Sequence, residues 1–117
     1  MDSAWIKAAI IEFHEEYWNK GNMDVVDKFL SPKYVGTDLA TGKTEGYAEI
    51  NQKPTATNLH IDLYDITVEG DRAAFHWAAS GNEPGGTPFH VVGFGLFTFE
   101  NGKVVTNSFL SAAFKPE

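Results

Sequence analysis

The stretch FHVVGFGLFTFENGKVVTNSFLSAAF, residues 89–114, decides the expected fold. Apolar residues, many of them aromatic or β-branched, dominate both 89–100 and 103–114, as in partly buried strands. Between the two runs stands Asn101-Gly102, the dipeptide most typical of a tight turn joining antiparallel strands. The stretch therefore predicts a long β-hairpin.

Two further strands are expected upstream of this hairpin. Residues 59–68 and 72–80 read as strands joined by the turn at 69–71, and a loop rich in Gly and Pro follows at 81–88. Gly81, Gly93 and Gly95 would let the strands bend. The four strands in sequence predict an antiparallel meander with strong curvature.

The N-terminal half reads as helical. Ile6, Ile10, Phe13 and Tyr17 form one stripe of a helix over residues 3–20, which Gly21 is expected to end. A second helix is predicted over 23–30, a short strand at 34–35, and one or two helical turns within 46–52. Helices followed by a meander predict an α+β fold, one domain over 1–117, with the sheet wrapped around the first helix.

Composition excludes several classes of function. The chain has no cysteine, so thiolate nucleophiles and thiolate metal sites are excluded. Its net charge of −7, without a basic run, predicts no nucleic-acid or membrane partner. No phosphate-binding or dinucleotide motif occurs, so we expect no cofactor. Without a signal-peptide or membrane-span pattern, we expect a cytoplasmic protein. The 16 aromatic residues predict an aromatic-rich core or a ring-lined cavity.

Several segments resemble SnoaL-like proteins of the NTF2-like superfamily. These are FHEEYWNKGNMD at 13–24, LSPKYV at 30–35, VEGDRAA at 68–74 and FTFENGKVV at 97–105. The resemblance implies an α+β cone, in which N-terminal helices pack on a strongly curved, mostly antiparallel sheet that encloses a pocket. It also implies a homodimer formed through the sheet. The superfamily includes polyketide cyclases, ketosteroid isomerases, dehydratases and non-catalytic modules.

The same resemblance yields two candidate catalytic residues. Counting back from Asn19-Lys20-Gly21 places His14 where ketosteroid isomerases carry an oxyanion-binding tyrosine, and a histidine can donate a hydrogen bond or move a proton. Asp38 occupies the interval of their general base, although an Asp before Gly42 is also typical of a turn. We therefore predict Asp38 as the base and His14 as the hydrogen-bond donor or acid, each with an ordinary structural alternative.

The resemblance also shows what this chain lacks. The third-strand acid of ketosteroid isomerases falls on Gly95, and the acidic residue and histidine of polyketide cyclases fall near Phe109 and Gly95. A true ketosteroid isomerase and the aldol-type cyclase mechanism are both disfavoured by these replacements.

The remaining site predictions concern the walls of the pocket. His76 and His90 lie on neighbouring predicted strands, but their spacing matches no metal-binding motif, so we predict no metal site. His60 is expected to face solvent. The residues predicted to bind the substrate are Tyr17, Trp18, Phe75, Trp77, His90, Phe97 and Asn107.

Two hypotheses for function follow. The first is a cofactor-independent isomerase, cyclase or dehydratase that acts by acid–base chemistry on a small apolar molecule carrying a carbonyl group, or on a polycyclic one. The second is a non-catalytic module that binds a small molecule or dimerises. The hypotheses differ in whether Asp38 and His14 meet in one open cavity.

Overall fold

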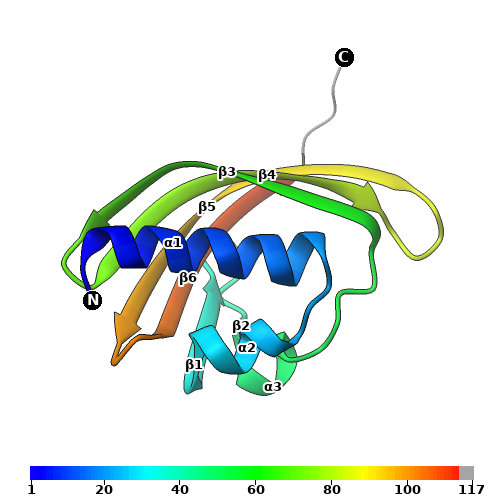
Figure 1. Ribbon diagram of the computed structural model, residues 1–117. Helices are drawn as coiled ribbons and strands as arrows, with labels where there is room; N and C mark the ends of the chain where they lie inside the picture. The colour runs from blue at the N-terminus through cyan, green and yellow to red at the C-terminus, as the bar shows by residue number, and fades with distance from the viewer. Residues whose placement is uncertain (114–117) are drawn as a thin grey trace.

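The structure, a computed structural model, describes residues 1–113. The four long strands of a six-stranded sheet curve over and behind the long N-terminal helix, and the other two strands lie below that helix with the two short helices (Figure 1). The helical elements are α1 Ser3–His14, the π-helical turn η1 Glu15–Asn19, α2 Asp24–Phe29 and α3 Tyr47–Ile50. The strands are β1 Leu30–Asp38, β2 Thr44–Gly46, β3 Thr57–Glu69, β4 Arg72–Asn82, β5 Pro88–Glu100 and β6 Lys103–Ala113.

The strand order is β2-β1-β6-β5-β4-β3. All neighbours pair antiparallel except β1 and β6, which run parallel. This confirms the predicted α+β fold with a curved, mostly antiparallel sheet. The strand predicted at 34–35 is longer in the structure and spans Leu30–Asp38. Its extra residues include ones that pair with β6, and a local sequence pattern does not reveal such a distant partner. Position 114 of the last predicted strand lies outside the described residues.

The first helix begins where its sequence pattern predicts, but of the predicted span 3–20 only Ser3–His14 is α-helical, and Glu15–Asn19 continues it as the π-helical turn. The Asp2 carboxylate accepts a hydrogen bond from the Trp5 backbone N–H at 2.8 Å and so caps the N-terminus. The stripe Ile6, Ile10, Phe13 and Tyr17 is buried, and Gly21 ends the helix at a φ of +66°. Burial of this stripe against the concave face of the sheet, at roughly 1.5–3 kcal/mol per large apolar side chain, fixes α1 in the cone.

Two aromatic rings on β4 lie across glycines of β5. Trp77 is paired with Gly93 and Phe75 with Gly95. A Cβ atom added to Gly93 would lie 2.5 Å from Cζ2 of Trp77 and 2.6 Å from the backbone oxygen of Leu110. The space left by the missing side chain is therefore filled by the Trp77 ring.

Candidate functional site

A cavity of about 520 Å³ lies between the first helix and the concave face of the sheet. This volume is within the usual range for small-molecule sites. Polar atoms are few along its walls, and its lining in the described part of the chain includes no lysine or arginine. The aromatic residues that line it are Phe13, Trp18, Tyr34, Phe75, Trp77, Phe89, Phe97 and Phe109.

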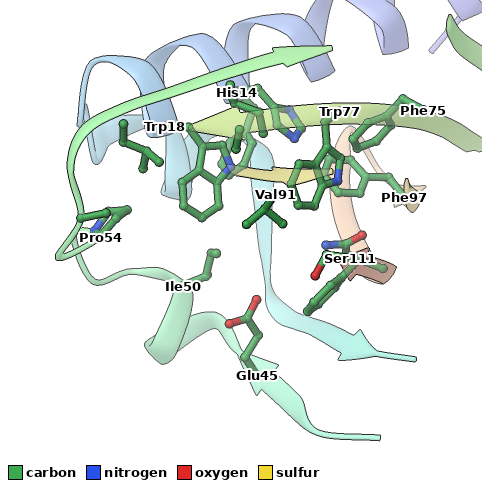
Figure 2. Close-up of a pocket in the computed structure, with 18 of the residues that line it drawn as sticks. His14, Trp18, Glu45, Ile50, Pro54, Phe75, Trp77, Val91, Phe97 and Ser111 are labelled. Carbon is green, nitrogen blue, oxygen red and sulfur yellow. The ribbon is translucent and has the colours of Figure 1, made fainter. Parts of the chain in front are cut away.

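His14 enters the cavity from the end of α1 (Figure 2). Its ring is 6 % exposed and lies 5.1 Å from Phe75, 5.6 Å from Phe13 and 5.8 Å from Phe97, measured between ring centroids. Burial among these rings lowers the pKa of His14 to about 4, although a hydrogen bond to the Ile10 backbone acts in the opposite direction. His14 is therefore neutral at pH 7.

The hydrogen bond of His14 defines which of its two ring nitrogens carries the proton. Nδ1 lies 2.8 Å from the Ile10 carbonyl oxygen, and because a carbonyl can only accept, Nδ1 carries the proton. Nε2 on the opposite side of the ring then has a lone pair and accepts hydrogen bonds. The predicted role of His14 as donor or acid does not fit this arrangement, whereas a role as acceptor does.

The π-helical turn positions Trp18 in the cavity wall. A π-turn holds more residues per turn than an α-helix and is often found at functional sites. The turn is held by Asn19, whose side chain accepts from the Ile61 backbone N–H at 2.7 Å and donates to the Ile61 carbonyl at 3.2 Å. The side-chain amide of Asn19 thus binds both backbone groups of Ile61, as the backbone of a neighbouring strand would. Helical periodicity alone gives no sign of this turn.

Tyr17 has a different place from the one predicted. Its hydroxyl group donates to the Ile50 carbonyl at 2.7 Å and lies 3.2 Å from the Gln52 carbonyl. Tyr17 therefore holds the segment after α3, and it lines a smaller neighbouring hollow rather than the main cavity. Trp18, Phe75, Trp77, Phe97 and Asn107 do line the main cavity, in agreement with their predicted positions.

Tyr34 and Asn107 form a polar pair in the wall made by β1 and β6. Burial raises the pKa of Tyr34 to about 12; a side-chain hydrogen bond with Asn107 lowers it and the negative charge of Glu45 raises it. The Oδ1 atom of Asn107 is buried and, among the residues described, has no hydrogen-bond partner. Such an atom costs about 1–3 kcal/mol, so it favours a ligand that donates a hydrogen bond to it.

Glu45 brings a carboxyl group to the cavity from β2, on the side opposite α1 (Figure 2). It lies opposite Gly36 in the β1–β2 register. Burial, and then the charge of Glu49, raises the pKa of Glu45 above its usual range. Sequence reasoning missed this residue because its signal is only a three-residue strand, whose register cannot be read from periodicity.

Asp38 does not line the cavity, and this differs from the prediction. Its Oδ1 atom accepts from the Ala40 backbone N–H at 2.9 Å, and its carbonyl accepts from Gly42 at 2.7 Å. The carboxylate therefore stabilises the turn between β1 and β2, the alternative that its position before Gly42 indicated. His14 and Asp38 do not meet in one cavity.

His90 is also absent from the cavity wall. Phe89 and Val91 of β5 face the cavity, so the alternation of the strand directs His90 to the outer face of the sheet. His76 shares that outer face, paired with Phe94 and hydrogen-bonded to Asp65 at 2.6 Å. Within residues 1–113, no three His, Asp or Glu side chains gather as metal ligands would. His60 is exposed, as expected, and contacts Asp62.

Comparison with known proteins agrees with this geometry. The sequence profile of the SnoaL-like domain matches residues 10–107. The chain belongs to the SnoaL-like family. This confirms the resemblance seen in its helical and hairpin segments. No sequence among curated proteins matches the chain significantly. In the part of the chain that the structure describes, no helix is long and apolar enough to cross a membrane.

Solved structures share the fold over most of the chain. A proposed SnoaL-like polyketide cyclase from Jannaschia sp. CCS1 is similar with 19 % identity and a TM-score of 0.77, covering 92 % of this chain and 85 % of its own. TsrD from Streptomyces laurentii has 25 % identity, a TM-score of 0.77, and coverages of 95 % and 90 %. A protein from Catenulispora acidiphila with a ketosteroid isomerase-like fold, solved with trimethylamine, has 19 % identity, a TM-score of 0.70, and coverages of 86 % and 82 %.

Proposed function

We propose that this SnoaL-like protein is a cofactor-independent enzyme of the cyclase, isomerase or dehydratase type. Its substrate is a small apolar molecule that carries a carbonyl group. The observation that carries this proposal is the cavity itself, which is apolar along its walls and includes the hydroxyl group of Tyr34, a hydrogen-bond donor for a carbonyl oxygen. Such a site orients a substrate and keeps water from a proton transfer.

One observation favours a second candidate function, a module that binds a small molecule without converting it. The carboxylate of Asp38 stabilises a turn and does not reach the cavity, so the predicted pair of Asp38 and His14 does not assemble. The two functions share ligand binding and differ in turnover. A test must therefore measure binding and proton transfer on the same compound.

The bicyclic ketone 2-tetralone provides that test. The hydrogens on the carbons next to its carbonyl group exchange with solvent deuterium each time the carbon is deprotonated and reprotonated. Loss of their ¹H NMR signals in D₂O therefore measures catalysed proton transfer, and saturation-transfer NMR measures binding of the same compound. We expect the wild-type protein to bind 2-tetralone and to accelerate exchange above the buffer rate. Binding without acceleration would favour the module over the enzyme.

Filling the cavity should abolish both signals. Ala79 lines the cavity, and Ala79→Trp would place an indole ring in it. We expect exchange to fall by about 100-fold or more, because loss of an acid–base site has that scale. Ala74→Trp is the matched control, since Ala74 lies on the same strand with its side chain exposed. Equal exchange rates in the two variants would contradict catalysis in this cavity.

We also propose that two copies of the chain associate through the outer face of the sheet. Phe94 is 65 % exposed there, beside Tyr64, Val92 and Leu110, which are each more than 40 % exposed. Exposed apolar patches of this kind are typical of interfaces. We expect Phe94→Glu to shift sedimentation from dimer to monomer, and Leu39→Glu, at the β1–β2 turn, to leave the dimer intact. A monomeric wild-type protein would contradict the proposal.

A further inference from the structure

We propose that Glu45 is the proton-transferring group of this cavity and that the Tyr34 hydroxyl group binds the carbonyl oxygen of the substrate beside it. This inference rests on the proposed function, because it names the residues that would perform its chemistry. The inference places proton transfer and carbonyl binding on residues of β1 and β2, and not on Asp38 in the turn between them.

Gly36 brings the two groups together. It stands between them, since Tyr34 lies two residues earlier on β1 and Glu45 lies opposite on β2. A Cβ atom on Gly36 would lie 2.7 Å from Oη of Tyr34 and 3.2 Å from Oε1 of Glu45. Both oxygens therefore converge on the space that the missing side chain leaves free. A donor and a carboxyl group then meet at one point of the cavity wall.

The surroundings of Glu45 suit a base that works near neutral pH. Glu49 on α3 raises the pKa of Glu45 through its negative charge. The charge of Glu45 in turn raises the pKa of Tyr34 on β1 and of Tyr17 in the π-helical turn. Among residues 1–113, no lysine or arginine lines this cavity to favour the ionised form of the carboxyl group. Burial and the charge of Glu49 raise the pKa of Glu45, which brings a carboxyl group closer to the working range of a general base.

Tyr34 is suited to the complementary role. Its pKa of about 12 keeps its hydroxyl group protonated at neutral pH, mainly because the ring is buried. It can therefore donate a hydrogen bond to an oxygen that gains negative charge. Asn107, which is hydrogen-bonded to Tyr34, keeps the phenol in place.

The proposed step balances without a cofactor. The Glu45 carboxylate takes a proton from the carbon next to the carbonyl group. The C–H electron pair forms a C=C bond, and the carbonyl π electrons move to the oxygen, which accepts the hydrogen bond of Tyr34. In a substrate with a C=C bond between the β and γ carbons, this enolate is a conjugated dienolate; its γ carbon takes the proton back from Glu45, and the C=C bond moves into conjugation with the re-formed carbonyl group. In a substrate with a second carbonyl group, the enolate carbon instead attacks that group, and the new alkoxide takes the proton as the ring closes.

The test uses exchange of 2-tetralone in D₂O on the full chain. We expect Glu45→Gln to reduce the rate by about 100-fold or more and Tyr34→Phe by at least about tenfold. Asp38→Asn is the matched control, because the amide oxygen can still accept from Ala40 and the rate should remain that of the wild type. Thermal unfolding checks that each variant is folded. Glu45→Asp should keep part of the activity, with its pH profile shifted, as expected if this carboxyl group moves the proton.

The outcomes separate the two proposals. Suppose that a folded Glu45→Gln variant exchanges 2-tetralone at the wild-type rate while Ala79→Trp loses exchange. The assignment of Glu45 would then be wrong, and the proposal that the protein is an enzyme would still hold. If Glu45→Gln is not folded, an unchanged pH profile in Glu45→Asp would overturn the assignment in the same way. If the wild-type protein binds 2-tetralone but exchanges nothing, both the enzyme and the assignment are wrong.

Discussion

Replacing Gly93 by alanine is expected to destabilise the protein by about 3 kcal/mol, at the upper end of the range for overpacked sites. The added Cβ would lie 2.6 Å from the backbone oxygen of Leu110 and 2.5 Å from the Trp77 ring. A ring can rotate, but the backbone of β6 cannot move without disturbing its pairing with β5. In a domain of this length, such a loss lowers the melting temperature by about 10 °C, which calorimetry can measure.

Two other glycines provide graded controls. Gly95→Ala should cost less, because the three heavy atoms nearest to its Cβ, the first at 2.9 Å, all belong to the side chain of Phe75 and not to the backbone. Gly85→Ala should be close to neutral, since no heavy atom lies within 4 Å of the added Cβ. Equal melting temperatures for the Gly93 and Gly85 variants would show that the β4–β6 region is more pliable than this packing implies.

The fold was predictable because its main signals are local. The Asn101-Gly102 turn and the buried stripe of α1 determine the hairpin and the helix, and both form as their sequence patterns indicate. The pairing of β1 with β6 was not predictable in the same way, because it joins residues about 70 positions apart and depends on parallel register. Gly93 was expected to let its strand bend, and the Trp77 ring that packs over it is not indicated by a local sequence pattern.

The candidate site was predictable only where it depends on elements with strong periodicity. His14 and the rings of β4 and β5 line the cavity because their helix and strands lie where the pattern puts them, whereas Trp18 is placed by the π-helical turn. Asp38 and Glu45 lie on either side of one turn, and a shift of a few residues there decides which carboxyl group reaches the cavity. His90 illustrates the same limit, because one step along a strand reverses the face.

Acidification is expected to remove about 3 kcal/mol of stability through His14 alone. The pKa of His14 is about 4 in the folded protein and 6.5 when the ring is in water. Between these values the unfolded chain binds a proton that the folded protein does not, so stability falls as pH drops from about 6.5 to about 4. Above that window the contribution is constant. The difference between the two pKa values corresponds to about 3 kcal/mol.

Urea unfolding at several pH values, from about 7 to about 4, measures this dependence. His14→Phe keeps an aromatic ring beside Phe97 but cannot titrate. Between pH 6.5 and pH 4, the free energy of unfolding of this variant should therefore fall by about 3 kcal/mol less than that of the wild type. Parallel slopes for the wild type and His14→Phe would mean that His14 accepts a proton in the folded cavity. Nε2 would then be a donor to the substrate, and the acceptor role derived from the Ile10 hydrogen bond would be wrong.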